Sequence, residues 1–177
     1  NILVSVGIND EYYFTNHSER VDQGCYHKIQ SILDKTTLLI GHNIKFDLMW
    51  LLESGFKYTG KVYDTMLGEY ILNRGIRKSL TLEMSCRRRK IGSKDSRIKE
   101  FTDRGIPFQN IPADLVEEYG RIDVVITRRL FDSQMDDLKM AKNKGLLMTL
   151  KMMNEFLVVL TDMERNGINI NLEDLSN

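Results

Sequence analysis

The sequence has little of what marks several protein classes. Its 177 residues include two cysteines and two prolines, and its formal net charge is zero. No apolar run approaches the roughly 20 residues of a membrane span. Cys25 and Cys86 lie far apart and fit no metal-ligand spacing, which excludes a disulfide scaffold and a zinc finger; we expect two free thiols in a reducing compartment. No secretory signal pattern is present, so we do not expect a secreted protein.

What remains is an ordinary globular composition, 42% apolar and 28% charged. The length suits one full domain and part of a second. Because the chain starts at Asn1 and enters a strand-like run at once, we expect the natural protein to extend upstream.

The order of strand and helix patterns predicts an α/β domain with a mixed sheet flanked by helices. An early hairpin turns at Asn9-Asp10, and a buried strand over 37–40 is expected to be covered on both faces. Helices are predicted over 22–34, 44–52, 64–72, 80–89, 113–138 and 145–165, and short strands over 61–63 and 168–170. The basic segment after 89 is predicted to be a loop, with or without one helical turn.

The segment Gly41-His42-Asn43-Ile44-Lys45-Phe46-Asp47 is the most informative. A strand ends in glycine, Asn43 is a candidate N-cap, and the helix that follows is apolar except near Asp47. An acid on an otherwise buried turn needs a reason, because an unpaired buried charge is costly. Asp47 is therefore a candidate site residue.

A second acid stands in Tyr119-Gly120-Arg121-Ile122-Asp123, where Tyr119 and Asp123 share a helix face. Carboxylates brought together by a fold suit hard divalent cations such as Mg²⁺. Two such ions about 4 Å apart cleave phosphodiesters by activating water and stabilising the leaving oxygen. The alternative is that both acids lie on solvated helix faces, although apolar neighbours argue against it.

These residues carry a family resemblance. Asn43-x-x-Phe46-Asp47 resembles the second motif, and Tyr119-x-x-x-Asp123 the third motif, of DEDD-type 3′–5′ exonucleases of the tyrosine variant. Tyr63 to Leu72 is similar to that family's intermediate Asp-Thr helix, and Leu160 to Ile168 resembles the entry to the polymerase domain of family A, DNA polymerase I-like enzymes of bacteria or phages. The resemblance covers nearly the whole chain.

The resemblance implies a ribonuclease H-like fold, an exonuclease domain over 1–142 and the start of a polymerase domain over 143–177. It also implies Mg²⁺ or Mn²⁺ as cofactor, two ions in the intact site, single-stranded DNA 3′ ends as substrate, a monomer, and a cytoplasmic location in a bacterial or phage-infected cell. Asp47 and Asp123 would bind the metals, Tyr119 would position the attacking water, and Asn43 would lie near the DNA end.

One departure from the family is large. Its first motif, Asp-x-Glu on the first strand, is absent near the start, so we expect that strand to lie upstream of Asn1 and the fragment alone to have little activity. The one Asp-x-Glu present, Asp162-Met163-Glu164, falls in a helical pattern where residues two apart do not share a face. Asp64 reads as a helix cap rather than a catalytic acid.

A basic run, Arg87-Arg88-Arg89-Lys90, lies in a segment (85–105) with eight Lys or Arg against three acids. It could track the phosphates of a single strand, or it could be a solvated helix end favoured by the helix dipole. The function expected is proofreading hydrolysis of the 3′-terminal phosphodiester. The alternatives are an inactive domain that supports an attached polymerase, and an RNase D-like exoribonuclease.

Overall fold

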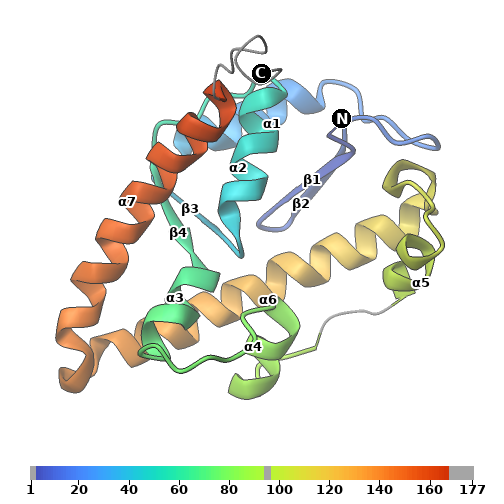
Figure 1. Cartoon of the computed structure of the whole chain (residues 1–177). Coiled ribbons are helices and arrows are strands. Elements are labelled where there is room, and N and C mark those ends of the chain that lie inside the picture. Colours follow the sequence, from blue (N-terminus) through green and yellow to red (C-terminus); the bar gives the residue numbers. More distant parts are fainter. Residues whose placement is uncertain (1–2, 94–96, 168–177) are drawn as a thin grey trace, which may run out of the picture.

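The computed structural model describes residues 3–93 and 97–167 (Figure 1). It is an α/β protein, as the sequence predicted, with long helices around small sheets. The elements are β1 Ser5–Ile8, β2 Glu11–Phe14, α1 Cys25–Lys35, β3 Leu38–Gly41, α2 Ile44–Glu53, β4 Lys61–Asp64, α3 Thr65–Leu72, α4 Leu82–Arg89, α5 Arg97–Asp103, η1 Phe108–Asn110, α6 Ala113–Lys139, η2 Ala141–Asn143 and α7 Lys144–Asn166. The strand predicted over 168–170 lies outside the described residues.

The described strands form an antiparallel pair and a parallel pair. β1 and β2 make the predicted hairpin, with Ile8 opposite Glu11 and Asn9 at a positive φ of 53° in the turn. β3 and β4 run parallel, with Gly41 opposite Asp64. A parallel pair needs a crossover, and α2 provides it. Both kinds of pairing expected of a mixed sheet are present, as two separate sheets within the described residues.

Helix α6 connects the two sheets. It packs against β1, β2 and β3, and also against α3, α4, α5 and α7 (Figure 1). Gly120 permits the close approach to the hairpin, because a Cβ there would lie 2.4 Å from a ring carbon of Tyr12. A side chain at 120 would therefore displace the Tyr12 ring from α6.

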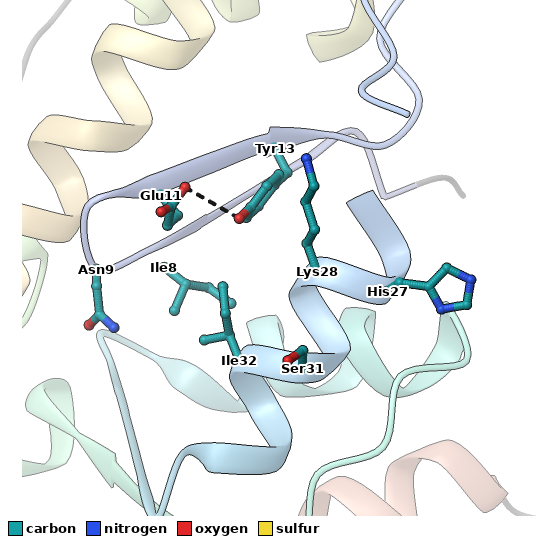
Figure 2. Close-up of a pocket in the computed structure, with 8 residues that line it drawn as sticks. All are labelled: Ile8, Asn9, Glu11, Tyr13, His27, Lys28, Ser31 and Ile32. Atoms are coloured by element: carbon teal, nitrogen blue, oxygen red, sulfur yellow. Dashed lines mark hydrogen bonds between the residues drawn. The ribbon is translucent and has the colours of Figure 1, made fainter. Parts of the chain in front are cut away.

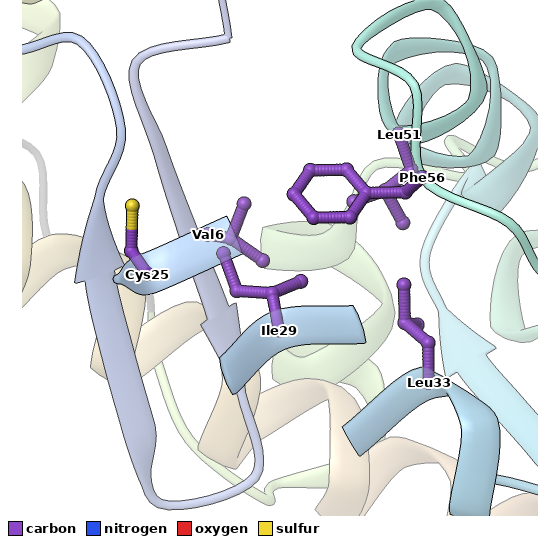
Figure 3. Close-up of a cluster of buried hydrophobic side chains, with 6 residues drawn as sticks. All are labelled: Val6, Cys25, Ile29, Leu33, Leu51 and Phe56. Atoms are coloured by element: carbon purple, nitrogen blue, oxygen red, sulfur yellow. The ribbon is translucent and has the colours of Figure 1, made fainter. Parts of the chain in front are cut away.

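One apolar cluster near the hairpin joins β1, α1 and α2. Figure 3 shows its buried members Val6, Cys25, Ile29, Leu33, Leu51 and Phe56. The contact fixes α1 and α2 relative to β1. Both cysteines are buried free thiols, which agrees with the prediction.

Helix α7 packs onto the rest of the molecule rather than standing apart. Leu150 and Leu157 are buried in clusters with residues of β4, α2 and α6, so this side of the helix faces inward. The helix ends at Asn166, one residue beyond the predicted 165, and Gly167 follows with a φ of 67°. No helix in the described part is long and apolar enough to cross a membrane.

Two local predictions were wrong. β3 is not covered on both faces: Leu38 is 38% exposed and the rest of the strand is half-buried. Its one strand partner within the described part is β4. The first turn of α2 is not buried either, because Phe46 is 54% exposed and Asp47 is also exposed.

Candidate functional site

Asp47 lies in the first turn of α2, where its carboxylate faces solvent on one side. The surrounding protein nevertheless removes much of its hydration, and this desolvation raises its pKa to about 6. The negative charges of Asp64 and Asp123 raise the pKa further. The charges of carboxylates on β4 and α6 therefore both act on Asp47 of α2.

Asp64 ends β4 and is almost completely buried, with 1% exposure. Its Oδ1 accepts the N–H of Met66 at 2.8 Å, which confirms the predicted N-cap of α3. Burial raises its pKa, and the backbone N–H groups that bond to it act in the opposite direction. Sequence reasoning missed its place beside Asp47; the available signal was an acid at the carboxyl end of a strand parallel to the strand before α2.

Tyr119 and Asp123 stand on α6, one turn apart and on one face of the helix. The charge of Asp123 contributes to the raised pKa of Asp47, after desolvation and the charge of Asp64. Tyr119 is half-buried and meets Phe108 edge to face, with ring centroids 6.4 Å apart. This contact holds the tyrosine ring at the border of the hairpin cluster around Tyr12 and Val116.

The loop before α2 has a conformation that the sequence did not predict. Asn43 occupies the N-cap position, but its φ of 58° is left-handed and its side chain makes no capping hydrogen bond. The capping prediction was wrong because a capping side chain requires an extended backbone at that position. The Asn43 side chain is exposed instead. The backbone N–H of Asn43 donates to Asp64 Oδ1 at 2.9 Å.

His42 ties the same loop to two neighbouring segments. Its Nε2 donates to the carbonyl of Leu80 at 2.8 Å, and its Nδ1 lies 2.9 Å from the hydroxyl of Thr65. The imidazole is therefore a structural link between the loop and the entry to α4.

The donor chemistry suits a hard divalent cation, because carboxylate oxygens are what Mg²⁺ prefers. Asp47 and Asp123 could hold such an ion; the pKa of Asp47 is raised by desolvation first and then by the charges of Asp64 and Asp123, and a cation would offset that repulsion. The described residues contain no group of three or more His, Cys, Asp or Glu that could hold a metal. Carboxylates are the right kind of ligand for such an ion, but Asp47 and Asp123 alone do not complete a metal site.

The basic run divides into two pairs. Arg88 and Arg89 turn inward and pair with the buried carboxylate of Glu69, at 3.0 and 2.5 Å, and Arg89 also pairs with Asp137 at 2.8 Å. Arg87 and Lys90 are exposed. The first pair thus has an internal structural role, and the second pair remains accessible.

The Asp-x-Glu in α7 has no part in this cluster. Asp162 is largely exposed, and Glu164 pairs with Lys45 of α2 at 2.6 Å. A separate hollow of about 450 Å³ lies between the hairpin turn and α1, lined by Asn9, Tyr13, Lys28 and Ile32 among others (Figure 2). It is open, and none of the three clustered carboxylates lines it.

Comparison with known proteins decides the family. The sequence profile described as 3′–5′ exonuclease matches residues 2–139. This chain belongs to the 3′–5′ exonuclease family. The match ends at the last residue of α6, so it includes Asp47, Tyr119 and Asp123 and leaves α7 outside.

Two bacterial relatives of this exonuclease chain are DNA polymerases I. That of Borreliella burgdorferi is 28% identical over 148 residues, which are 84% of this chain and 16% of that protein. That of Chloroflexus aurantiacus is 29% identical over 139 residues, 76% of this chain and 14% of that protein. The chain spans about a sixth of the length of these curated relatives, and the polymerase I resemblance expected from the motifs is confirmed.

Proposed function

We propose that this chain forms the 3′–5′ proofreading exonuclease part of a DNA polymerase I-like enzyme. The reaction is hydrolysis of the 3′-terminal phosphodiester of single-stranded DNA, with release of nucleoside monophosphates. The observation that carries the proposal is the match of residues 2–139 to the 3′–5′ exonuclease family, a range that contains Asp47 on α2 and Tyr119 and Asp123 on α6. The charge of Asp123 also contributes to the raised pKa of Asp47, which supports a shared site.

Each residue has a role that follows from its position. Asp47 and Asp123 would hold divalent metal ions, which when bound supply an activated water and stabilise the leaving oxygen. Tyr119, one turn before Asp123, would orient the attacking water through its hydroxyl. Asn43 presents an exposed amide at the start of α2, where it can bind the terminal nucleotide.

The carboxylates of this chain make half of the family's set. Two further acids, expected on an Asp-x-Glu strand, would complete the site, so we propose that the chain alone binds metal weakly and degrades DNA slowly. Mg²⁺ and Mn²⁺ are the ions proposed, because both take oxygen ligands.

Arg87 and Lys90 would contact the phosphates of the incoming strand. Both are exposed at the end of α4, whereas Arg88 and Arg89 are paired with Glu69. This keeps the sequence-based proposal of a basic phosphate track and narrows it to two of the four residues. Such contacts are independent of base sequence and weaken with salt.

Residues 143–177 would begin the attached polymerase domain. In support, α7 lies beyond the family match, and the curated DNA polymerase I relatives are about six times as long as the matched region. Exposed apolar side chains of α7, among them Met148, Met152 and Phe156, would pack in that enzyme.

The test is degradation of 5′-labelled single-stranded DNA by this chain with Mn²⁺ or Mg²⁺, beside Asp123→Ala and the surface control Asp162→Asn. We expect slow, stepwise 3′ shortening that Asp123→Ala abolishes and Asp162→Asn retains. Equal rates in all three proteins would refute the assignment. Preference for an RNA oligonucleotide would favour an exoribonuclease, and absence of shortening by a folded, metal-bound chain would favour the inactive support domain.

A further inference from the structure

The carboxylate of Asp64 makes two backbone hydrogen bonds through one oxygen. Oδ1 accepts the N–H of Met66 at 2.8 Å and the N–H of Asn43 at 2.9 Å. The first bond caps α3. The second reaches across the parallel strand pair to the loop that begins α2.

Capping alone does not explain an acid at this position. Serine and threonine cap helices about as well as aspartate, and α4 is capped in this way by Thr81, whose hydroxyl accepts the N–H of Met84 at 3.3 Å. Asp64 is 1% exposed, and its Oδ2 has no hydrogen-bond partner among the described residues. Burying a carboxylate there costs free energy, so we expect the second hydrogen bond, from the Asn43 N–H, to have a role of its own.

The loop Gly41–Asn43, whose Asn43 N–H donates this bond, sets the direction of α2. Asn43 has a left-handed φ of 58° and no capping bond from its own side chain, and its carbonyl accepts the N–H of Phe46 at 3.0 Å. Asp47 follows one residue later. A shift of Asn43 would therefore move the turn that carries Asp47.

The acceptor itself is held from behind. The N–H of Asp64 donates to Asn154 Oδ1 of α7 at 2.8 Å, and the hydroxyl of the next residue, Thr65, donates to the carbonyl of Gly41 at 3.0 Å. Asp64 is thus fixed by α7 and by β3, and its Oδ1 is a rigid acceptor for the Asn43 N–H.

We propose that Asp64 is a positioning residue that latches the loop Gly41–Asn43 and so holds Asp47 in place for metal binding. The metal part of this inference rests on the proposed function, and the latch does not. Asp64 acts through Asn43, by an accepted hydrogen bond, and contributes no ligand of its own.

Three variants at one position separate the possibilities. Asp64→Asn keeps an Oδ1 acceptor and loses the charge. Asp64→Ser keeps a cap for α3 but is about one bond too short to reach Asn43 as well. Asp64→Ala loses both bonds. Thr81→Ala is the matched control, because it removes the side-chain cap of a helix of equal length, eight residues, and leaves in place the main-chain carbonyl of Leu80 that bonds to His42 of the loop.

The readouts are amide hydrogen exchange at residues 43–47 and Mn²⁺ affinity measured by electron paramagnetic resonance. We expect Asp64→Ser and Asp64→Ala to exchange the Asn43 amide about tenfold faster and to bind Mn²⁺ several-fold more weakly. Asp64→Asn and Thr81→Ala should match the unmodified chain at the loop and in Mn²⁺ affinity.

Other results would overturn the inference. If amide hydrogen exchange at residues 43–47 were unchanged in Asp64→Ser, the hydrogen bond from Asn43 to Asp64 would not hold the loop in place. Asn and Ser variants with equally poor Mn²⁺ affinity would instead make the Asp64 charge a direct requirement of metal binding. If the unmodified chain bound no Mn²⁺, the proposed function would fail for this chain, and hydrogen exchange would still decide whether the latch exists.

Discussion

Glu69 offers the sharpest test of how the interior of this protein is held together. The residue lies on α3 with 3% exposure and pairs with Arg88 at 3.0 Å and Arg89 at 2.5 Å. Its Oε1 also accepts from Gln134 Nε2 at 3.1 Å, and the side chain of Gln134 is fully buried. Glu69 therefore joins α3, α4 and α6 at one buried point.

Glu69→Ala should be strongly destabilising. It would leave Arg88 without its carboxylate partner and Arg89 with the partly exposed Asp137 as its remaining carboxylate, and removing one member of a buried ion pair costs about 3–5 kcal/mol. For a domain of this size, each kcal/mol shifts Tm by roughly 2–4 °C, so the expected loss is roughly 6–20 °C. Glu69→Gln, which keeps an acceptor for one arginine, should lose less.

The assay is urea unfolding at pH 7 with thermal unfolding as a check. The control is Asp132→Ala, which removes the exposed pair with Arg128, where the side chains are 65% and 56% exposed. Such pairs contribute about 0.5 kcal/mol or less. If Glu69→Ala lost no more than Asp132→Ala, the inward orientation of Arg88 and Arg89 would be wrong, and all four basic residues would return as candidates for DNA binding.

Three further predictions concern Asp47, Gly68 and Arg87. The pKa of Asp47 is raised to about 6, above the unfolded value of about 4, so the folded chain holds this proton more tightly than the unfolded chain does. The free energy of unfolding should therefore fall as pH rises from 4 to 6. Urea unfolding at several pH values should show a flatter fall for Asp47→Asn. Gly68→Ala should destabilise by about 1–3 kcal/mol in the same assay, because its Cβ would lie 2.4 Å from Gln134 Oε1, whereas Gly145→Ala meets nothing within 4 Å and should be neutral or stabilising. Arg87→Ala should reduce the salt dependence of single-stranded DNA binding by a log–log slope of about 0.7 in fluorescence anisotropy, and an unchanged slope, as expected for Lys151→Ala on α7, would remove Arg87 from the phosphate track.

Local sequence signals predicted the elements well because each had its own cause. The Asn9-Asp10 turn and the Asp64 cap are short-range features that fix boundaries regardless of the rest of the fold. The site was predicted from motif order, and that Asp47 and Asp123 form one metal site stays a prediction, which the contribution of Asp123 to the raised pKa of Asp47 supports.

Long-range contacts were beyond that reasoning. The bond from Asn43 to Asp64 depends on the parallel register of β3 and β4, which no single segment encodes. The inward turn of Arg88 and Arg89 depends on Glu69, about 20 positions earlier on another helix. A run of four basic residues looks uniform in sequence, and only packing separates its buried members from its exposed ones.

The most direct test of the account is Mn²⁺ binding by this chain, followed by electron paramagnetic resonance, for the unmodified protein, Asp123→Ala and Asp162→Asn. The account predicts that Asp123→Ala weakens Mn²⁺ binding by at least about tenfold, as loss of a metal-site residue does, while Asp162→Asn leaves it unchanged. Equal affinity of the unmodified chain and Asp123→Ala for Mn²⁺ would contradict the claim that Asp47 and Asp123 together form the metal site.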